Sequence, residues 1–195
     1  MKNIDNIKAF CQQIIRYVGN GYKYIQISNI PQNKVHKISK IEEKITKKYN
    51  TNLTTWQRQY RKRKNIANFV ALRYKTTIII LKTEGNTNIQ DKFEDVFNKK
   101  NVISFNYLKI RLIKDERNKL TYVLERNLLK DIKAKIKLAI KNKRGNDFHK
   151  ELNKLYNLHK TLNYRGINKQ ISDILKMIKT EQKIHGTNFN LPKFF

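Results

Sequence analysis

Residues 69–81, FVALRYKTTIIIL, contain two apolar runs, Phe69–Tyr74 and Thr76–Leu81, on either side of Lys75. Short runs that are rich in Val, Ile, Tyr and Phe are typical of strands. Their close spacing predicts either an antiparallel hairpin that turns near Lys75 or one bent strand. Both alternatives place β-structure in the N-terminal half of the chain.

The segments before this pair follow helix and strand patterns in turn. Apolar residues recur at helical spacing over 3–18, which predicts a helix that ends at the Gly19–Gly21 turn. Residues 22–30 alternate as a half-buried strand does, and Pro31 ends the pattern. A second amphipathic helix with a lysine-rich far side is predicted from the apolar stripe Val35, Ile38, Ile41 and Ile45.

The segments after this pair predict a further strand pair and then helices. A short helix is expected over 89–97, because apolar residues share one face there. Residues 103–113 and 120–125 form the clearest strand pair, joined by the turn 115–118. From residue 127 onward the pattern predicts three helices. The first is expected to end near Gly145, and the second to begin with a cap at Asn146 or Asp147. The third is expected to end near Gly186, before an extended segment over 187–195.

These patterns predict an α+β fold. We expect a small, mostly antiparallel sheet with N-terminal helices, followed by a C-terminal three-helix segment. The expected division is a basic, nucleic-acid-binding α+β domain over 1–126 and a helical segment with an extended tail over 127–195. One compact domain fits the sequence equally well.

The charge of the chain indicates an anionic partner. The sequence has 43 Lys and Arg against 15 Asp and Glu, a formal net charge of +28. Such an excess of one sign destabilises the compact state by self-repulsion, so we expect a polyanion to justify it, and nucleic acid is the first candidate. An AT-rich genome favours Lys through codon bias, but the same bias should also have supplied Asp and Glu.

Other classes of protein are disfavoured by composition. Cys11 is the only cysteine, which excludes an intramolecular disulfide and any zinc site with two thiolates from this chain, and indicates a reducing compartment. No apolar run is long enough for a membrane span, and the N-terminal residues resemble neither a secretory signal nor a mitochondrial presequence. We therefore expect an organelle matrix, with the protein encoded in the organelle, or a bacterial cytoplasm.

The densest cluster of cations is the strongest candidate for a binding element. Residues 56–64 read WQRQYRKRK, and this segment combines phosphate-binding cations with flat aromatic faces on which unpaired bases can stack. The alternative is a core tryptophan beside a solvated charge run. The predicted nucleic-acid-binding residues of this segment are Trp56, Arg58, Tyr60, Arg61, Lys62, Arg63 and Lys64.

A second candidate surface lies on the strand pair 103–125. Period-two alternation separates the apolar Leu108, Ile110 and Leu112 from a row of two aromatic and two basic residues. Such a row can stack bases and hold the backbone, although it lacks the signature of known RNA-binding sheets. The alternative is that the C-terminal helices cover this face. The predicted binding residues are Phe105, Tyr107, Lys109 and Arg111.

A third candidate is the basic side of the C-terminal helices, which can follow a phosphate backbone or simply face solvent. The stripe opposite the first apolar face consists of Lys130, Lys133, Lys137, Lys141 and Arg144. On the last helix, Lys169, Lys176 and Lys183 recur every seven residues.

Catalysis finds little support in the sequence. The four histidines, His36, His149, His159 and His185, are scattered without metal-ligand spacing, and we expect no cofactor and no metal. Glu84, Asp91 and Asp95 are the one group of carboxylates that could hold Mg²⁺ for a nuclease. Asp91, Glu94 and Asp95 fit equally well as the acidic first turns of a helix.

Together these observations favour a structural, non-catalytic RNA-binding protein of a large ribonucleoprotein, specifically a ribosomal protein that contacts rRNA phosphates and neighbouring proteins. RNA is favoured over DNA because several cationic surfaces, instead of one, suit burial in folded RNA. The alternative is a DNA-binding protein of a plasmid or other mobile element, acting in replication or mobilisation, with or without metal-dependent nuclease activity. A single basic face beside a carboxylate cluster would favour that alternative.

Overall fold

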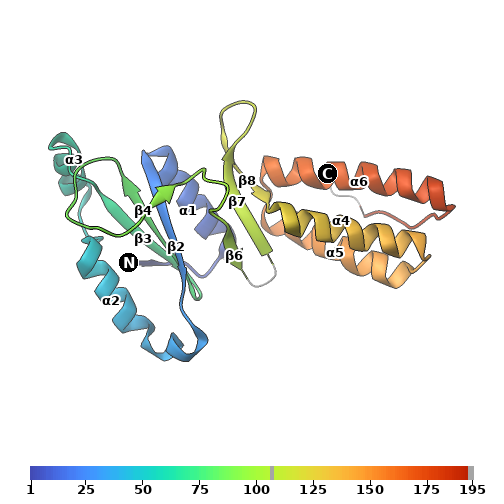
Figure 1. Cartoon of the computed structure of the whole chain (residues 1–195), viewed down its shortest axis with the longest axis horizontal. Helices are drawn as coiled ribbons and strands as arrows, with labels where there is room; N and C mark the ends of the chain where they lie inside the picture. The colour runs from blue at the N-terminus through green and yellow to red at the C-terminus, as the bar shows by residue number, and fades with distance from the viewer. Residues whose placement is uncertain (106–107, 193–195) are drawn as a thin grey trace. The chain divides into compact units, whose positions relative to one another are not determined.

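The computed structural model describes residues 1–105 and 108–192. It confirms the predicted α+β class, with N-terminal helices, small sheets that are mostly antiparallel and three C-terminal helices (Figure 1). The contacts divide the chain into two compact units, Met1–Ile103 and Ser104–Phe195. Most of the strand pair predicted within the N-terminal half thus belongs to the second unit.

The first unit is built on a five-stranded sheet with the order β1-β3-β4-β2-β5. Only β1 and β3 run parallel, and the other neighbours are antiparallel. The hairpin alternative for residues 69–81 is confirmed, with Lys75 in the left-handed region at φ 52° between the paired strands. The strands are β1 (Lys2–Asn3), β2 (Tyr22–Asn29), β3 (Phe69–Tyr74), β4 (Thr77–Thr83) and β5 (Glu94–Asp95).

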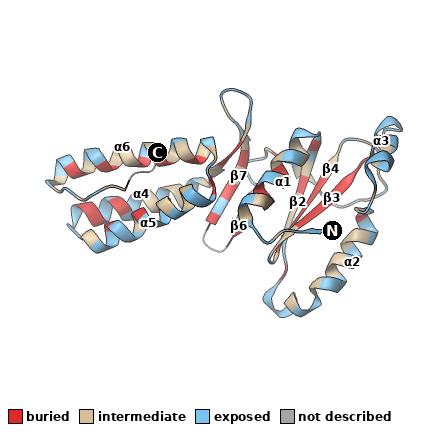
Figure 2. Ribbon diagram, turned by 180° about the vertical axis from the view of Figure 1, so that it is seen from behind, coloured by how far each residue is buried: buried red, intermediate tan, exposed pale blue. Residues whose placement is uncertain are grey.

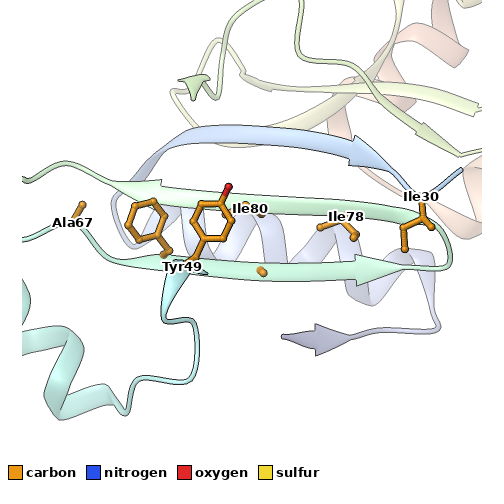
Figure 3. Close-up of a cluster of buried hydrophobic side chains, with 7 residues drawn as sticks. Ile30, Tyr49, Ala67, Ile78 and Ile80 are labelled. Atoms are coloured by element: carbon orange, nitrogen blue, oxygen red, sulfur yellow. The ribbon is translucent and has the colours of Figure 1, made fainter. Parts of the chain in front are cut away.

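Helices cover both faces of this sheet (Figure 1). On one face lies α1 (Ile7–Gly19), whose Phe10, Cys11 and Ile14 are fully buried. On the other face, α2 (Ile38–Tyr49) follows the 3-10 helix η1 (Gln32–Lys37) and packs on a cluster of buried side chains along β3 and β4 (Figure 3). A sheet that is covered on both faces buries consecutive residues, which is why 69–81 reads as continuous apolar runs.

The prediction of a helix over 89–97 is wrong. This segment is an irregular connection that ends in β5, where Glu94 and Asp95 pair with Ile25 and Tyr24 of β2. The Phe93 ring lies 5.7 Å from the Phe69 ring, between centroids, and packs with the α2-side cluster. The apolar spacing that suggested a helix therefore reflects separate side chains anchored in the core. The helix expected over 3–18 also begins later, because Asn6 caps it and residues 2–3 form β1.

The second unit combines a three-stranded sheet with a three-helix bundle. The predicted strand 103–113 is divided into two strands, and residues 106–107 lie outside the described residues. The helical pattern predicted from residue 127 onward is confirmed. The buried apolar residues of the last two helices are Phe148, Leu152, Leu155, Ile167, Ile171, Ile174 and Ile178. The elements are β6 (Ile103–Phe105), β7 (Leu108–Lys114), β8 (Leu120–Leu124), α4 (Arg126–Lys141), α5 (Gly145–Thr161) and α6 (Arg165–His185).

The sheet belongs with the helices because α6 is fixed directly to β8. Gln170 accepts a hydrogen bond from the Leu124 backbone N–H at 2.7 Å and donates one to the Leu124 carbonyl at 3.3 Å. Gly166 allows the close approach, because a Cβ at this position would lie 2.5 Å from the Tyr122 carbonyl oxygen. This interlock explains why the strand pair groups with α6.

The helix ends agree with the sequence in part. The last helix stops at Gly186, which takes the left-handed conformation at φ 59°, as predicted. The cap expected at Asn146 or Asp147 is wrong: α5 begins at Gly145, after Arg144, without a side-chain cap. Residues 187–192 are non-helical, and the Phe189 ring stacks on Phe148 with 4.9 Å between centroids. The terminal Phe pair lies outside the described residues.

Candidate nucleic-acid interface

The segment 56–64 folds as helix α3 (Thr55–Arg63), and its start is set by a capping box. The Gln57 backbone N–H donates to Thr54 Oγ1 at 3.2 Å, and the Thr54 N–H donates to Gln57 Oε1 at 2.9 Å. Both bonds satisfy amide groups that the first turn of a helix leaves without partners. A nine-residue helix with mostly polar side chains is thereby held at a defined start.

Arg58 lies on the inner side of α3 and is used within the protein. Its Nη1 donates to the Phe69 carbonyl and to the Tyr22 hydroxyl, both at 2.9 Å. The other two bonds run from Nη2 to the Thr51 carbonyl at 2.7 Å and from Nε to the Leu53 carbonyl at 3.1 Å. Burial raises the pKa of Tyr22, and the neighbouring Arg58 charge opposes that rise. Arg58 thus positions the helix and is not free for a phosphate.

Arg61 also faces inward, one turn later. Its Nη2 donates to the Ala67 carbonyl at 2.6 Å, and the Ile66 backbone N–H donates to the Arg61 carbonyl at 2.8 Å. Asn68, which is 4% exposed, donates from Nδ2 to the Arg58 carbonyl at 3.0 Å. The inner side of α3 is therefore hydrogen-bonded to the chain that leads into β3.

The other aromatic and basic residues of this segment are exposed. Trp56 is 71% exposed and Tyr60 is 48% exposed, and their rings stack with 6.0 Å between centroids and 16° between planes. The side chains of Lys62, Arg63 and Lys64 are exposed and form no ion pair within the described residues. Figure 2 shows α3 as a mostly exposed helix beside the buried strands. We call these five residues the α3 surface.

The α3 surface lies in a long stretch without acidic residues. Residues 44–83 contain no Asp or Glu and eleven Lys and Arg. The potential around α3 is therefore set by cations alone along this part of the chain. A count of acidic residues along the sequence would have revealed this stretch, which the density of cations at 56–64 marks only at its centre.

The binding row predicted on the strand pair 103–125 is not found as an open surface. Phe105 is 8% exposed and belongs to the core, so it does not present an open face. Lys109 is exposed, and Arg111 is partly exposed and engaged within the protein. Tyr107 lies outside the described residues. The structure thus does not bring this row together as a surface of two open aromatic rings and two cations.

The basic stripe on α4 is shared between solvent and internal ion pairs. Lys130 and Lys141 are exposed, and Lys133 is partly buried. Lys137 Nζ lies 2.6 Å from Glu181 Oε1, and Arg144 Nη1 lies 3.9 Å from Asp147 Oδ2. On α6, Lys169 is paired with Glu116, while Lys176 and Lys183 are exposed.

The carboxylates that the sequence suggested as metal ligands each contact a different partner within the protein. Glu84 pairs with Lys23 at 2.9 Å, and Asp91 accepts hydrogen bonds from Lys48 and from the Tyr49 hydroxyl. The Lys48 ammonium is the main cause that lowers the pKa of Asp91. Within residues 1–105 and 108–192, no three His, Cys, Asp or Glu side chains gather as metal ligands would.

No protein-family model, curated protein or solved structure matches the chain. In the part of the chain that the structure describes, no helix combines the length and apolar character that a membrane crossing requires.

Proposed function

We propose that the chain is a structural, non-catalytic RNA-binding protein of a large ribonucleoprotein, and that the α3 surface is one of its RNA contacts. The observation that carries the proposal is the exposed Trp56–Tyr60 stack on a helix with three exposed cations that form no ion pair within the described residues. Cations bind phosphate through charge-assisted hydrogen bonds, and aromatic faces bind bases by stacking. A helix that exposes both groups suits a nucleic acid better than a protein or a small anion.

The distribution of charge along the chain supports contact with RNA by both units. Residues 1–103 have 21 Lys and Arg against 7 Asp and Glu, and residues 104–195 have 22 against 8, so each part has a net charge of +14. Each internal ion pair uses one charge of either sign and leaves this excess unchanged. A protein that reads one DNA groove needs one basic face, whereas a protein embedded in folded RNA meets phosphate from several directions.

The nuclease alternative has less support from the contacts. Glu84, Asp91 and Asp95 would have to share a metal ion, yet Glu84 pairs with Lys23 and Asp91 with Lys48. Asp95 Oδ1 accepts the Phe97 backbone N–H at 2.7 Å and so shapes the turn after β5. These contacts account for the three carboxylates without a metal.

The proposal is tested by measuring how RNA affinity depends on salt. We expect the full chain to bind a structured RNA, with log Kd rising steeply with log salt because phosphate contacts release counterions. Replacing Lys62, Arg63 and Lys64 together by Gln should reduce the slope by about 2, since each lost contact contributes about 0.7–0.9.

The matched control keeps the charges at the same positions. Lys62→Arg, Arg63→Lys and Lys64→Arg together should bind within about twofold of the unmodified protein, because phosphate contact depends mainly on charge. A duplex DNA of the same length serves as the competing ligand. Failure of the full chain to bind RNA at low ionic strength, or tighter binding of DNA throughout, would contradict the proposal.

A further inference from the structure

Two nearly parallel, exposed rings on a helix with several exposed cations suit one form of RNA better than another. We propose that the α3 surface binds an unpaired stretch of RNA, with a base stacked on Trp56 and the phosphates continuing along lysines of α2. This inference rests on the proposed function, because it names the form of RNA that the same surface takes. It also adds residues of α2 that were not among the predicted site residues.

The ring geometry favours an unpaired base. The planes of Trp56 and Tyr60 differ by 16°, and Trp56 is the more exposed of the two rings. A base can extend such a stack only if one of its faces is free. Bases in a duplex are stacked on both sides and present only their edges, so a duplex would first have to expel a base at a cost in free energy.

The hydrogen bonds of α3 hold the Trp56–Tyr60 ring pair in place without a ligand. The capping box fixes the first turn of α3, and the inward bonds of Arg58 and Arg61 fix its inner side. The exposed rings therefore project from a helix that is anchored at several points. Preorganisation of this kind lowers the entropic cost of binding.

Three lysines form a row along α2, the helix that precedes α3 in the chain. Lys40, Lys44 and Lys47 are spaced at i, i+4 and i+7, so they share one face of the helix over about 10 Å. All three are exposed and form no ion pair or side-chain hydrogen bond within the described residues. We call them the α2 row, and they lie opposite the stripe that packs on the sheet.

The α2 row and the α3 surface are fixed relative to each other. The Thr51 N–H donates to the Thr46 carbonyl at 3.2 Å, and the Thr51 carbonyl accepts Arg58 Nη2 at 2.7 Å. This pair of bonds ties the C-terminal end of α2 to the inner side of α3. The C-terminal end of α2 is therefore held next to α3, and the proposal places one RNA strand over both helices.

The fluorescence of Trp56 tests the inference, because it is the only tryptophan of the chain. The full-length protein is titrated with a uridine oligomer of about a dozen nucleotides, a length within the range of single-strand sites, and with an RNA duplex of equal length. Binding is followed independently by the anisotropy of a labelled RNA. We expect strong quenching of Trp56 at saturation with the oligomer and little change at saturation with the duplex.

Variants separate stacking from phosphate contact. Trp56→Ala and Tyr60→Ala should each weaken oligomer binding by about 5- to 100-fold, while duplex binding stays within about twofold. Lys44→Gln with Lys47→Gln should weaken oligomer binding and reduce the salt slope by about 1, with quenching at saturation retained. The charge-preserving pair Lys44→Arg and Lys47→Arg is the matched control and should bind as the unmodified protein does.

The possible failures are distinguishable. If the oligomer binds without quenching Trp56, or the duplex quenches it equally, the inference is overturned while RNA binding stands. If neither RNA binds at low salt, the proposed function fails and the inference fails with it. If Trp56→Ala weakens oligomer and duplex binding equally while its circular dichroism is unchanged, base stacking is not the role of Trp56.

Discussion

Helix α3 and the strand pair of the second unit have similar compositions and different surroundings. Both interleave aromatic residues with cations, but α3 keeps Trp56 71% exposed, whereas Phe105 of β6 is 8% exposed. A short helix that packs by one side leaves its other aromatic residues in solvent, while a strand buries every second residue wherever a layer covers it. Composition alone therefore does not identify a binding surface.

The two regions also differ in how their charges are used. No acidic residue occurs over 44–83, and Lys62, Arg63 and Lys64 form no ion pair with any residue that the structure describes. In the β7–β8 turn, Asp115 pairs with Arg165 at 3.0 Å and Glu116 pairs with Lys169, which ties the turn to α6. Arg165 and Lys169 thus serve the fold through these ion pairs, whereas the cations of the α3 surface form no ion pair within the described residues.

The strongest test of this contrast removes one aromatic ring from each region. Phe105→Ala should lower the free energy of unfolding by about 3–4 kcal/mol, because a buried ring leaves a cavity. Trp56→Ala should lower it by no more than about 0.5 kcal/mol, because the indole is exposed. Urea denaturation of the two variants measures the free energy of unfolding. Equal decreases in the two variants would contradict the difference between the two regions.

The second test separates the two sides of α3. Arg58→Ala should cost about 2–3 kcal/mol of unfolding free energy, because it removes the donor to the carbonyls of Thr51, Leu53 and Phe69. Arg63→Ala on the outer side should change stability by less than about 0.5 kcal/mol and weaken RNA binding. A stable Arg58→Ala variant with weakened RNA binding would show that Arg58 contacts the ligand.

The third test concerns the interlock of β8 with α6. Gly166→Ala should cost about 2 kcal/mol, because the added Cβ meets the Tyr122 carbonyl at 2.5 Å, where backbone cannot give way. The matched control is Gly145→Ala, whose Cβ would lie 3.4 Å from the Phe189 ring and should change stability little. Thermal unfolding followed by circular dichroism compares them, and similar melting temperatures would contradict the interlock.

The smallest expected effect is the acid sensitivity of the second unit. The Lys119 N–H lowers the pKa of Asp115, Lys169 lowers the pKa of Glu116, and the Asn127 N–H lowers the pKa of Glu125. Because the folded-state pKa values are depressed, their stabilising effect is present above the unfolded values near 4 and disappears as the pH falls through the folded ones.

Thermal melts between about pH 6 and pH 2.5 measure this effect. The melting temperature should fall as the pH is lowered, and the fall should be smaller for Asp115→Asn combined with Glu116→Gln. An unchanged pH dependence in that double variant would show that these carboxylates are not depressed by their partners.

The sequence predicts helices and strands well where the local pattern of apolar residues alone determines which side chains are buried. The β-structure over 69–81 and the buried stripe of α6, Ile167–Ile178, follow from apolar runs and helical spacing, whereas the runs alone left a hairpin and one bent strand as alternatives. The helix expected over 89–97 failed because Ile89 and Phe93 pack individually against the α2-side cluster, a tertiary contact that imitates helical spacing. The interlock at Gly166 depends on a close approach between segments far apart in sequence, which no local pattern reports.

The candidate site could be predicted in composition but not in orientation. Residues 56–64 form a helix with Trp56 and Tyr60 one turn apart, as their spacing allows. Which cations face outward depends on which side of α3 packs against the chain that leads into β3. Arg58 and Arg61 are therefore indistinguishable in sequence from Arg63, although they hold the helix in place.

Crosslinking tests the central claim most directly. Ultraviolet irradiation of the cells that make the protein, followed by identification of crosslinked peptides, locates the residues in contact with RNA. We predict RNA attached to peptides that contain Trp56 or Tyr60, because these exposed rings would stack on bases. Recovery of DNA in place of RNA, or of crosslinks confined to the second unit, would contradict the account.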